Sequence, residues 1–313
     1  MDRIDEDMAA CLEQVVQEEA RRDHDGGMAT TLEVIGKGSP ELFGICAVGD
    51  GSAASKAGDA DEPFPVESVA KALTLALALE DRGLPKVLER VDVEPEGDPY
   101  HTIASLEEGA QAKGMPSNPM VNAGAIAVVS LVKGADGDER FARIREFARA
   151  LAGNPRIDYN RRLFETEDKD LNRALFYYMR SHDVVQGSEE DVLMPYIKQG
   201  ALEMDCTDLA RCAAVLANGG RDPASGTRLV SAETVRIVLT LMFTTGMYQG
   251  SGRFSVDVGI PAKSGVSGAL MAVAPGRMGF GLIGPSLDAD GNSIAGVRML
   301  RQVVERRKLR VFG

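Results

Sequence analysis

The sequence predicts a mixed α/β fold of the α+β class: a mainly antiparallel sheet flanked by helices, joined to a lobe of helices. Strand-like patterns occur near both ends of the chain, a long stretch of helical patterns separates them, and a helical pattern follows the last strands. Strands from the two ends would therefore complete one sheet. We expect a single domain, with the sheet lobe formed by 1–67 and 221–313 and the helical lobe by 68–220.

The first part of the sheet lobe is predicted from three local signals. A helical pattern covers 6–22, and residues 42–48 alternate as in a β-strand. Gly49-Asp50-Gly51 then favours a hairpin turn, which sends a second strand back along the first. That strand would lead the chain toward residue 68, where the helical stretch begins.

The remaining elements follow from apolar periodicity and from the residues that stop it. Pro63 and Pro65 break the segment before Ser68, and a helical pattern then runs to Gly83. Strands are predicted where short apolar runs flank the turn at 275–277. Further helices are predicted at 120–132, 139–151, 168–180, 207–218, 231–242 and 297–308, and the late strands at 269–274 and 279–283.

Composition excludes several classes of function. Lys and Arg total 35 against 47 for Asp and Glu, so the formal net charge is −12. Such a chain is repelled by nucleic acid and by anionic membranes. The acidic start lacks the apolar segment of a secretory signal, and the four cysteines form no C-x-x-C pair. We expect a cytoplasmic protein without zinc, nucleic-acid partner or membrane span.

Ser68-Val69-Ala70-Lys71 is the strongest chemical motif. A serine hydroxyl is a weak nucleophile unless a base lies within hydrogen-bond reach, and a lysine three residues later shares its helix face. The predicted start of the helix at Ser68 also offers free N–H groups to a developing oxyanion. Lys263-Ser264-Gly265 follows far downstream, and the two strings are the outer parts of a serine-hydrolase set in which lysine activates serine.

Two other motifs are better explained without function. Ser130 and Lys133 repeat the serine–lysine spacing, but they lie within the apolar run 120–132, so we interpret the match as coincidence. The glycines of 279–284 match a dinucleotide-binding fingerprint. Because Pro285 follows where a phosphate-binding helix should begin, we interpret them as ordinary strand residues.

Five polar residues occupy positions that a plain core does not require. Asn122 opens an apolar helical segment, and a buried amide needs hydrogen-bond partners. Glu165 and Asn172 are seven residues apart and would share a face of one helix. Tyr196 and Tyr248 lie in loop-like contexts, where a tyrosine beside a serine–lysine pair can relay protons. Taken singly, each also fits a structural role: local backbone bonding, a solvated surface, or packing.

These residues and their surroundings resemble those of the bacterial-type glutaminase family. Its members are serine-dependent amidohydrolases with a β-lactamase-like (DD-peptidase-like) fold. The resemblance covers almost the whole chain. Its motifs are Ser68–Lys71, the N-P-M-V-N-A-G-A-I string at 118–126, Asn172–Leu175 with Tyr178, 216–220, the P-A-K-S-G-V-S-G string at 261–268, and 291–293.

The resemblance implies the chemistry of the site. Ser68 would attack the side-chain amide of L-glutamine, with Lys71 as its base. The backbone N–H groups of Ser68 and Val266 would form the oxyanion hole. Tyr196 and Tyr248 would lie near the serine, with Tyr248 returning a proton to the leaving ammonia. No metal or organic cofactor is implied.

The resemblance also implies how the substrate is held. Asn122, Glu165 and Asn172, with Tyr196, would hold the amino-acid end. This agrees with physical expectation, because a zwitterion requires a carboxylate for its ammonium group and amide donors for its carboxylate. A small-molecule enzyme of this kind is expected to form a symmetric homo-oligomer, a dimer or a tetramer.

Two residues depart from the family pattern. Glu67 stands where glutamine usually precedes the nucleophile, and Thr31 stands where a tyrosine usually covers the pocket. Glu67 lies four residues from Lys71, where a carboxylate favours the charged lysine. We therefore expect weak activity, activity at higher pH, or a changed substrate. The alternatives are a related acyl hydrolase acting on β-lactams or peptides, and a scaffold that binds an amino acid without turnover.

Overall fold

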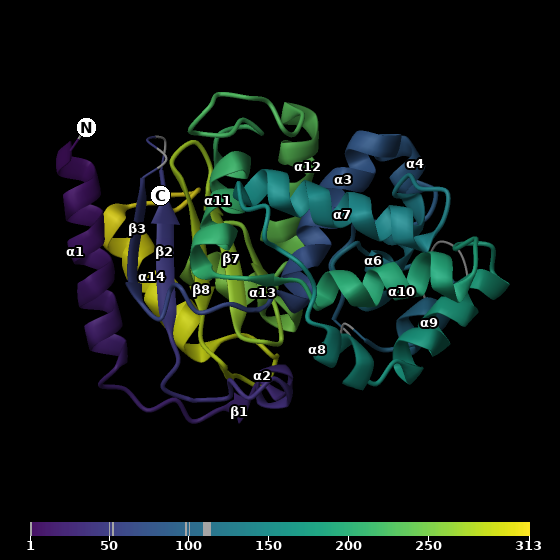
Figure 1. Ribbon diagram of the computed structural model, residues 1–313, viewed down its shortest axis with the longest axis horizontal. Helices are drawn as coiled ribbons and strands as arrows, with labels where there is room; N and C mark the ends of the chain where they lie inside the picture. The colour runs from purple at the N-terminus through teal and green to yellow at the C-terminus, as the bar shows by residue number, and fades with distance from the viewer. Residues whose placement is uncertain (1, 50, 52, 98, 100, 109–113) are drawn as a thin grey trace.

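A five-stranded antiparallel sheet, in the order β3-β2-β8-β7-β6, forms one side of the molecule (Figure 1). The computed structural model describes residues 2–49, 51, 53–97, 99, 101–108 and 114–313. Asp50, in the predicted turn at 49–51, lies outside this part of the chain. The strands are β2 (Gly44–Val48), β3 (Ala54–Gly58), β6 (Ala262–Ser264), β7 (Ala269–Ala274) and β8 (Met278–Ile283).

The two ends of the chain meet in this sheet, as predicted. Strand β2 pairs with β3 on one side and with β8 on the other, so Ile45 lies opposite Leu282. Helices α1 (Asp2–Glu19) and α14 (Ile294–Arg307) cover one face, and α11 (Cys206–Ala217) covers the other. Because helices cover both faces, the central strand β2 is buried on both sides, whereas the edge strand β3 is partly exposed.

The two faces contribute to two separate apolar cores. Ile45 and Ala47 belong to the core under α1 and α14, whereas Cys46 and Val48 belong to the larger core that α11 and the helical lobe share. All five residues of β2 are buried. A strand buried on both faces shows little alternation of polar and apolar residues, and its sequence, Gly-Ile-Cys-Ala-Val, has this property.

The helical lobe comes from the middle of the chain (Figure 1). Its elements are η1 (Glu67–Val69), α3 (Ala70–Arg82), α4 (Leu84–Leu88), α5 (Ala104–Glu108), α6 (Asn122–Leu131), α7 (Gly137–Ala152), α8 (Arg161–Thr166), α9 (Asp170–Ser181) and α10 (Glu189–Gly200). The other elements are β1 (Gly27–Met28), α2 (Thr30–Val34), β4 (Phe64–Pro65), β5 (Glu203–Met204), α12 (Ala232–Thr245), η2 (Tyr248–Gly250), α13 (Ser251–Asp257) and β9 (Ser286–Leu287).

Two helices pack across the expected border between the lobes. Helix α11 lies within the segment 68–220 but packs on the sheet, and α12 lies in the segment 221–313 but packs against α3. The core that includes α3, α11 and α12 is continuous. The assignment of a single domain with the stated lobe boundaries stays a prediction.

The glycines of the apparent dinucleotide fingerprint make room for α11. Gly279 and Gly281 lie in β8, and Gly284 follows its last residue. A Cβ atom on Gly281 would lie 2.1 Å from the carbonyl oxygen of Cys206. A Cβ atom on Gly279 would lie 2.2 Å from the backbone nitrogen of Ala214. Helix and strand therefore approach more closely than any side chain allows, and the interpretation as strand residues is confirmed for Gly279 and Gly281.

The helices of the described part of the chain are either too short or too polar to cross a membrane.

Candidate active site

The turn that carries Ser68 is held from both sides. Strand β4 pairs with β5, and the N–H of Val66 donates to the carbonyl of Leu202 over 2.9 Å. Glu67 then adopts a left-handed backbone with φ of +49°, which is uncommon outside glycine. The chain makes one 3₁₀ turn at 67–69 before α3 begins at Ala70. Ser68 therefore lies in the turn just before the α-helix, and its side chain is 8% exposed.

Lys71 lies on the first turn of α3, where it is 3% exposed. Its amine donates to the Oδ1 atom of Asn122 over 2.6 Å and to the carbonyl oxygen of Met120 over 3.2 Å. Burial lowers the pKa of Lys71 to about 7, and the opposing effect of Glu67 is smaller. A large fraction of Lys71 is therefore neutral near pH 7 and able to accept a proton from Ser68, which lines the same small cavity.

Asn122 joins Lys71 to a residue from a different helix. It begins α6, accepts from Lys71, and donates from its amide nitrogen to the Oδ1 atom of Asn172 over 3.2 Å. Asn172 lies on α9 and is buried. The half-buried amide of Asn122 thus has side-chain partners beyond its own backbone. By contrast, Ser130 of the second serine–lysine pair donates to the carbonyl of Ala127 within its own helix.

The predicted carboxylate Glu165 does not lie in this site. Helix α8 ends at Thr166 and α9 begins at Asp170, so Glu165 and Asn172 do not share a helix, and the side chain of Glu165 is exposed. Glu167, two residues later, instead lines the cavity with Ser68. The sequence held no signal for this shift, because the end of α8 depends on tertiary contacts. One of them is the packing of α2 against α8. The amine of Lys169 also donates locally to the Phe164 and Glu167 carbonyls over 2.5 and 3.0 Å.

Tyr196 lies in a helix, not in the predicted loop. Helix α10 continues through Pro195, although proline removes one backbone donor and usually breaks a helix. The carbonyl of Asp191, four residues earlier, accepts instead from the guanidinium of Arg140. Tyr196 is thereby held at the cavity, where its ring is almost fully buried.

The cavity at Ser68 encloses about 30 Å³. It is lined by Glu67, Ser68, Lys71, Glu167, Tyr196, Ile197, Gln199 and Gly200. This volume holds one water molecule and is far too small for an amino acid. Binding of an amino acid therefore requires side chains or backbone to move apart.

Tyr248 lies beside the second lysine motif. Its phenol donates to the carbonyl of Ser264 over 3.0 Å, and the same carbonyl accepts from the amine of Lys263 over 2.6 Å. That amine also donates to the carbonyl of Gly246 over 3.2 Å and lies 4.5 Å from the centre of the Tyr248 ring. Burial and the nearby charge of Lys71 lower the pKa of Lys263 well below its usual range. Lys263 therefore fixes the backbone that positions Tyr248.

Val266 lies in the turn between β6 and β7, against the nucleophile turn. A Cβ atom on Gly265 would lie 2.6 Å from the carbonyl oxygen of Val66, so the two backbones are in direct contact. A Cβ atom on Gly291 would lie 3.7 Å from Val266 and 3.8 Å from the ring of Tyr248. The β6–β7 turn thus lies between Tyr248 and the residues that precede Ser68.

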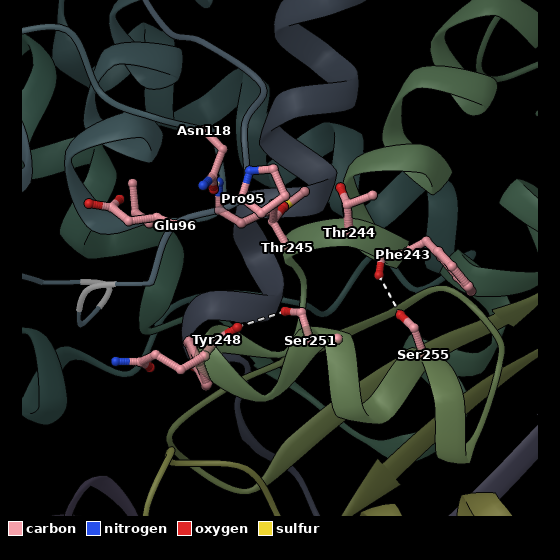
Figure 2. Close-up of a pocket in the computed structure, with 13 residues that line it drawn as sticks. Pro95, Glu96, Asn118, Phe243, Thr244, Thr245, Tyr248, Ser251 and Ser255 are labelled. Carbon is pink, nitrogen blue, oxygen red and sulfur yellow. Dashed lines mark hydrogen bonds between the residues drawn. The ribbon is translucent and has the colours of Figure 1, made fainter. Parts of the chain in front are cut away.

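A larger cavity of about 330 Å³ lies next to Tyr248 (Figure 2). One wall comes from Pro95, Glu96 and Asn118, and the other from α12, η2 and α13. Ser251 donates to the carbonyl of Tyr248 over 2.7 Å and holds η2 in place. Met120 also lines this cavity, and its carbonyl accepts from Lys71. The two cavities are therefore neighbours across Met120, and sequence patterns did not reveal the larger one.

The departures Glu67 and Thr31 lie on η1 and α2, two elements that both adjoin strand β4. Burial raises the pKa of Glu67 to about 8, the charge of Glu167 adds to this effect, and Lys71 opposes it. For both Lys71 and Glu67, the effect of burial on the pKa is larger than the effect of their mutual attraction. Glu67 therefore does not hold Lys71 in its charged form near neutral pH. Helix α2, which carries Thr31, packs against β4 and α8, and the Thr31 hydroxyl is buried without a hydrogen-bond partner.

Across the described part of the chain, histidine, cysteine and carboxylate side chains form no group of three or more that could hold a metal ion.

Comparison with known proteins assigns the family. A family model described as Glutaminase matches residues 26–312. "Glutaminase 2" of Clostridium perfringens is 44% identical over 303 residues, which cover 96% of this chain and 99% of that protein. The glutaminase of Shouchella clausii is 48% identical over 258 residues, covering 82% and 83%.

Solved structures agree with the sequence comparison. A probable glutaminase from Bacillus subtilis superposes with a TM-score of 0.90 at 31% identity and covers 98% of each chain. The same bacterium's probable glutaminase complexed with 6-diazo-5-oxo-L-norleucine gives a TM-score of 0.87 at 31% identity, covering 97% of this chain and 96% of that one. These neighbours have the β-lactamase-like fold that the sequence predicted. The match over nearly the full length, in sequence and in structure, shows that this chain belongs to the glutaminase family.

Proposed function

We propose that this protein hydrolyses the side-chain amide of L-glutamine to L-glutamate and ammonia, through an acyl-enzyme on Ser68. The observation that carries the proposal is the shared cavity of Ser68, Lys71, Glu167 and Tyr196 in a chain of this family. A structural neighbour was solved with a glutamine analogue, which supports the same substrate class.

The first half of the reaction makes the acyl-enzyme. Neutral Lys71 takes the proton of the Ser68 hydroxyl while the serine oxygen attacks the amide carbon. The N–H groups of Ser68 and Val266 stabilise the oxyanion of the tetrahedral intermediate. Tyr248 donates its phenolic proton to the amide nitrogen as the carbon–nitrogen bond breaks, and ammonia leaves. The proximity of the β6–β7 turn to η1 supports the assignment of Val266.

The second half releases the product. A water molecule attacks the ester carbon of the acyl-enzyme, and its proton passes to the Tyr248 phenolate, which lost its own proton to the leaving ammonia. The carbon–oxygen bond to Ser68 breaks, the serine regains its proton, and L-glutamate leaves. Lys71 gives Ser68 the proton that it took in the first half, so both Lys71 and Tyr248 return to their starting states.

The amino-acid end of the substrate is assigned to four residues. Glu167 replaces Glu165 as the carboxylate for the substrate's ammonium group, because it lines the cavity and Glu165 does not. Amide groups of Asn122 and Asn172, with the phenol of Tyr196, are assigned to the substrate's carboxylate. The Lys71–Asn122–Asn172 chain of hydrogen bonds supports this grouping, because it joins the base to the binding residues.

Ammonia release from L-glutamine tests the proposal. The purified protein should release ammonia and L-glutamate in equal amounts, and Ser68→Ala should abolish the release. Equal rates for the two proteins would exclude Ser68 as the nucleophile. Glu167→Gln and Glu165→Gln form a matched pair: the first should raise KM strongly and the second should leave it unchanged. The reverse result would return the binding role to Glu165.

We further propose a cytoplasmic location and a symmetric homo-oligomer. Four unpaired cysteines, three of them buried, support a reducing compartment. Leu171 and Tyr177 on α9 are 46% and 49% exposed and support a contact between copies at this helix. Light scattering of the wild type and of Leu171→Ser tests the second point, and a monomeric wild type would exclude it.

A further inference from the structure

The cavity at the nucleophile contains two carboxyl groups from different parts of the chain. Glu67 comes from η1, and Glu167 comes from the segment between α8 and α9. The left-handed backbone of Glu67 directs its side chain inward, where Oε2 lies 3.5 Å from the position that a Cβ atom would take on Gly200. The carboxyl group of Glu67 is thereby held against α10, in the cavity that Ser68 and Lys71 also line.

The charged and titratable groups around Glu67 are few. Helix α3 contributes Lys71, the segment after α8 contributes Glu167, and α10 contributes Tyr196. Strand β6 contributes Lys263, which donates to backbone carbonyls, and the six residues of β7 are all apolar. Lys198 of α10 pairs with Asp138 over 3.1 Å. Two carboxyls thus share this cavity with one lysine whose own pKa is lowered to about 7.

Such a pair cannot carry two full charges at neutral pH. Burial raises the pKa of Glu67 to about 8 and that of Glu167 to about 7. Each charge also disfavours the other, so the protons belong to the pair and not to either residue alone. Near pH 7.5 these values leave about one proton on the two carboxyls.

We propose that Glu67 is a specificity-determining residue that acts with Glu167: in the empty site the two carboxyls hold a proton, and the α-ammonium group of the substrate replaces it. The inference rests on the proposed function for the identity of the substrate. An ammonium group between two ionised carboxylates satisfies both, whereas a neutral amine or a methyl group leaves them repelling each other. The pair therefore selects amino acids with a free, charged α-amino group, and the proton leaves to solvent on binding.

Counting the protons released on binding tests the inference directly. Titration calorimetry of L-glutamine into Ser68→Ala, in two buffers of different ionisation enthalpy, gives this number without turnover. We expect a release of about one proton at pH 7.5 and no net release at pH 9, where the pair is already ionised and the partly neutral amino group of the substrate takes up a proton. Binding without proton release at pH 7.5 overturns the inference, and it does so without relying on any change at Glu67.

The variant Glu67→Gln removes one of the two carboxyls and keeps the shape of the side chain. In the Ser68→Ala background it should reduce the release at pH 7.5 to about a quarter of a proton, because Glu167 is then the one carboxyl left in the pair. Glu165→Gln, on the exposed end of α8, is the matched control and should release as many protons as the parent. Equal release with and without Glu67 overturns the inference.

Steady-state kinetics separates this inference from the proposed function. In the active enzyme, KM for L-glutamine should fall about a hundredfold from pH 6.5 to 8.5, and Glu67→Gln should flatten this dependence above pH 7. Acetylation of the α-amino group of L-glutamine should abolish its binding to the enzyme that retains Glu67. An active enzyme whose KM profile is unchanged by Glu67→Gln overturns the inference alone. A wild type that releases no ammonia refutes the proposed function, and the calorimetric count still decides the role of Glu67.

Discussion

The charge state of Lys71 determines whether Ser68 can act as a nucleophile, and Lys71→Arg tests it. With a pKa of about 7, about half of the Lys71 side chains are neutral at pH 7. With the ordinary lysine pKa, only about one in 2,500 would be neutral at this pH. Burial against Met120 and Asn122 thus supplies roughly a thousandfold more free base. Arginine stays charged at any accessible pH, so the substitution removes the base while keeping the length and the charge of the acid form.

The expected result is a loss of kcat of about a thousandfold or more in Lys71→Arg. The wild type should show kcat rising about tenfold per pH unit below pH 7 and levelling above pH 8, because loss of the proton from Lys71 creates the base. The assay is ammonia release from L-glutamine at saturating substrate from pH 5.5 to 9. Circular dichroism and thermal melting of both proteins establish that the variant is folded.

Lys133→Arg is the matched control for this experiment, because Lys133 has the same spacing from Ser130. It should leave the rate and the pH profile unchanged. Two results would refute the reasoning: a wild-type kcat that still rises tenfold per unit above pH 9, or a Lys71→Arg enzyme that keeps more than a tenth of the wild-type rate. The first would mean that Lys71 stays charged, and the second that another group is the base.

The other predictions concern the partners of this base and the packing beneath it. In the wild type the Lys71 amine lies 2.6 Å from the amide oxygen of Asn122, and Asn122→Asp places a carboxylate at this position. The carboxylate favours charged Lys71, so the rise of kcat with pH should shift to higher pH by about one unit or more. An unshifted pH profile contradicts this contact. Tyr248→Phe should lower kcat about a hundredfold with little change in KM, and a loss under fivefold argues against proton donation. Gly281→Ala should destabilise the fold by about 3 kcal/mol in urea denaturation, whereas Gly252→Ala, with open space around its Cβ position, should change stability little or increase it.

Much of the fold was visible in local patterns. Strand β7 spans Ala269–Ala274, as predicted, and β8 spans Met278–Ile283, one residue longer than predicted. Strands of this kind can be predicted because a run of apolar residues lies between residues that favour turns. Helix α10 was not recognised, because Pro195 lies within it and its compensating donor, Arg140, comes from α7. A helix that continues through a proline can be predicted only when the donor to the freed carbonyl is known.

The site divides in the same way. The sequence by itself determined that Ser68 and Lys71 can meet, because a spacing of three residues places them on one side of a single turn wherever that turn lies. It also determined the family, through motifs that span the chain. It did not determine which carboxylate, Glu165 or Glu167, enters the cavity, because a two-residue choice at the end of α8 depends on contacts with distant segments.

The tertiary structure alone decided the protonation of the site. By sequence distance, Glu67 should keep Lys71 charged, since they are four residues apart. In the folded chain, burial under α10 and α6 costs each ionised group more than their attraction returns, so the pKa of Lys71 falls and that of Glu67 rises. Proximity along a chain sets which charges meet, but the loss of water around them is a property of the whole fold, and here it is the larger effect.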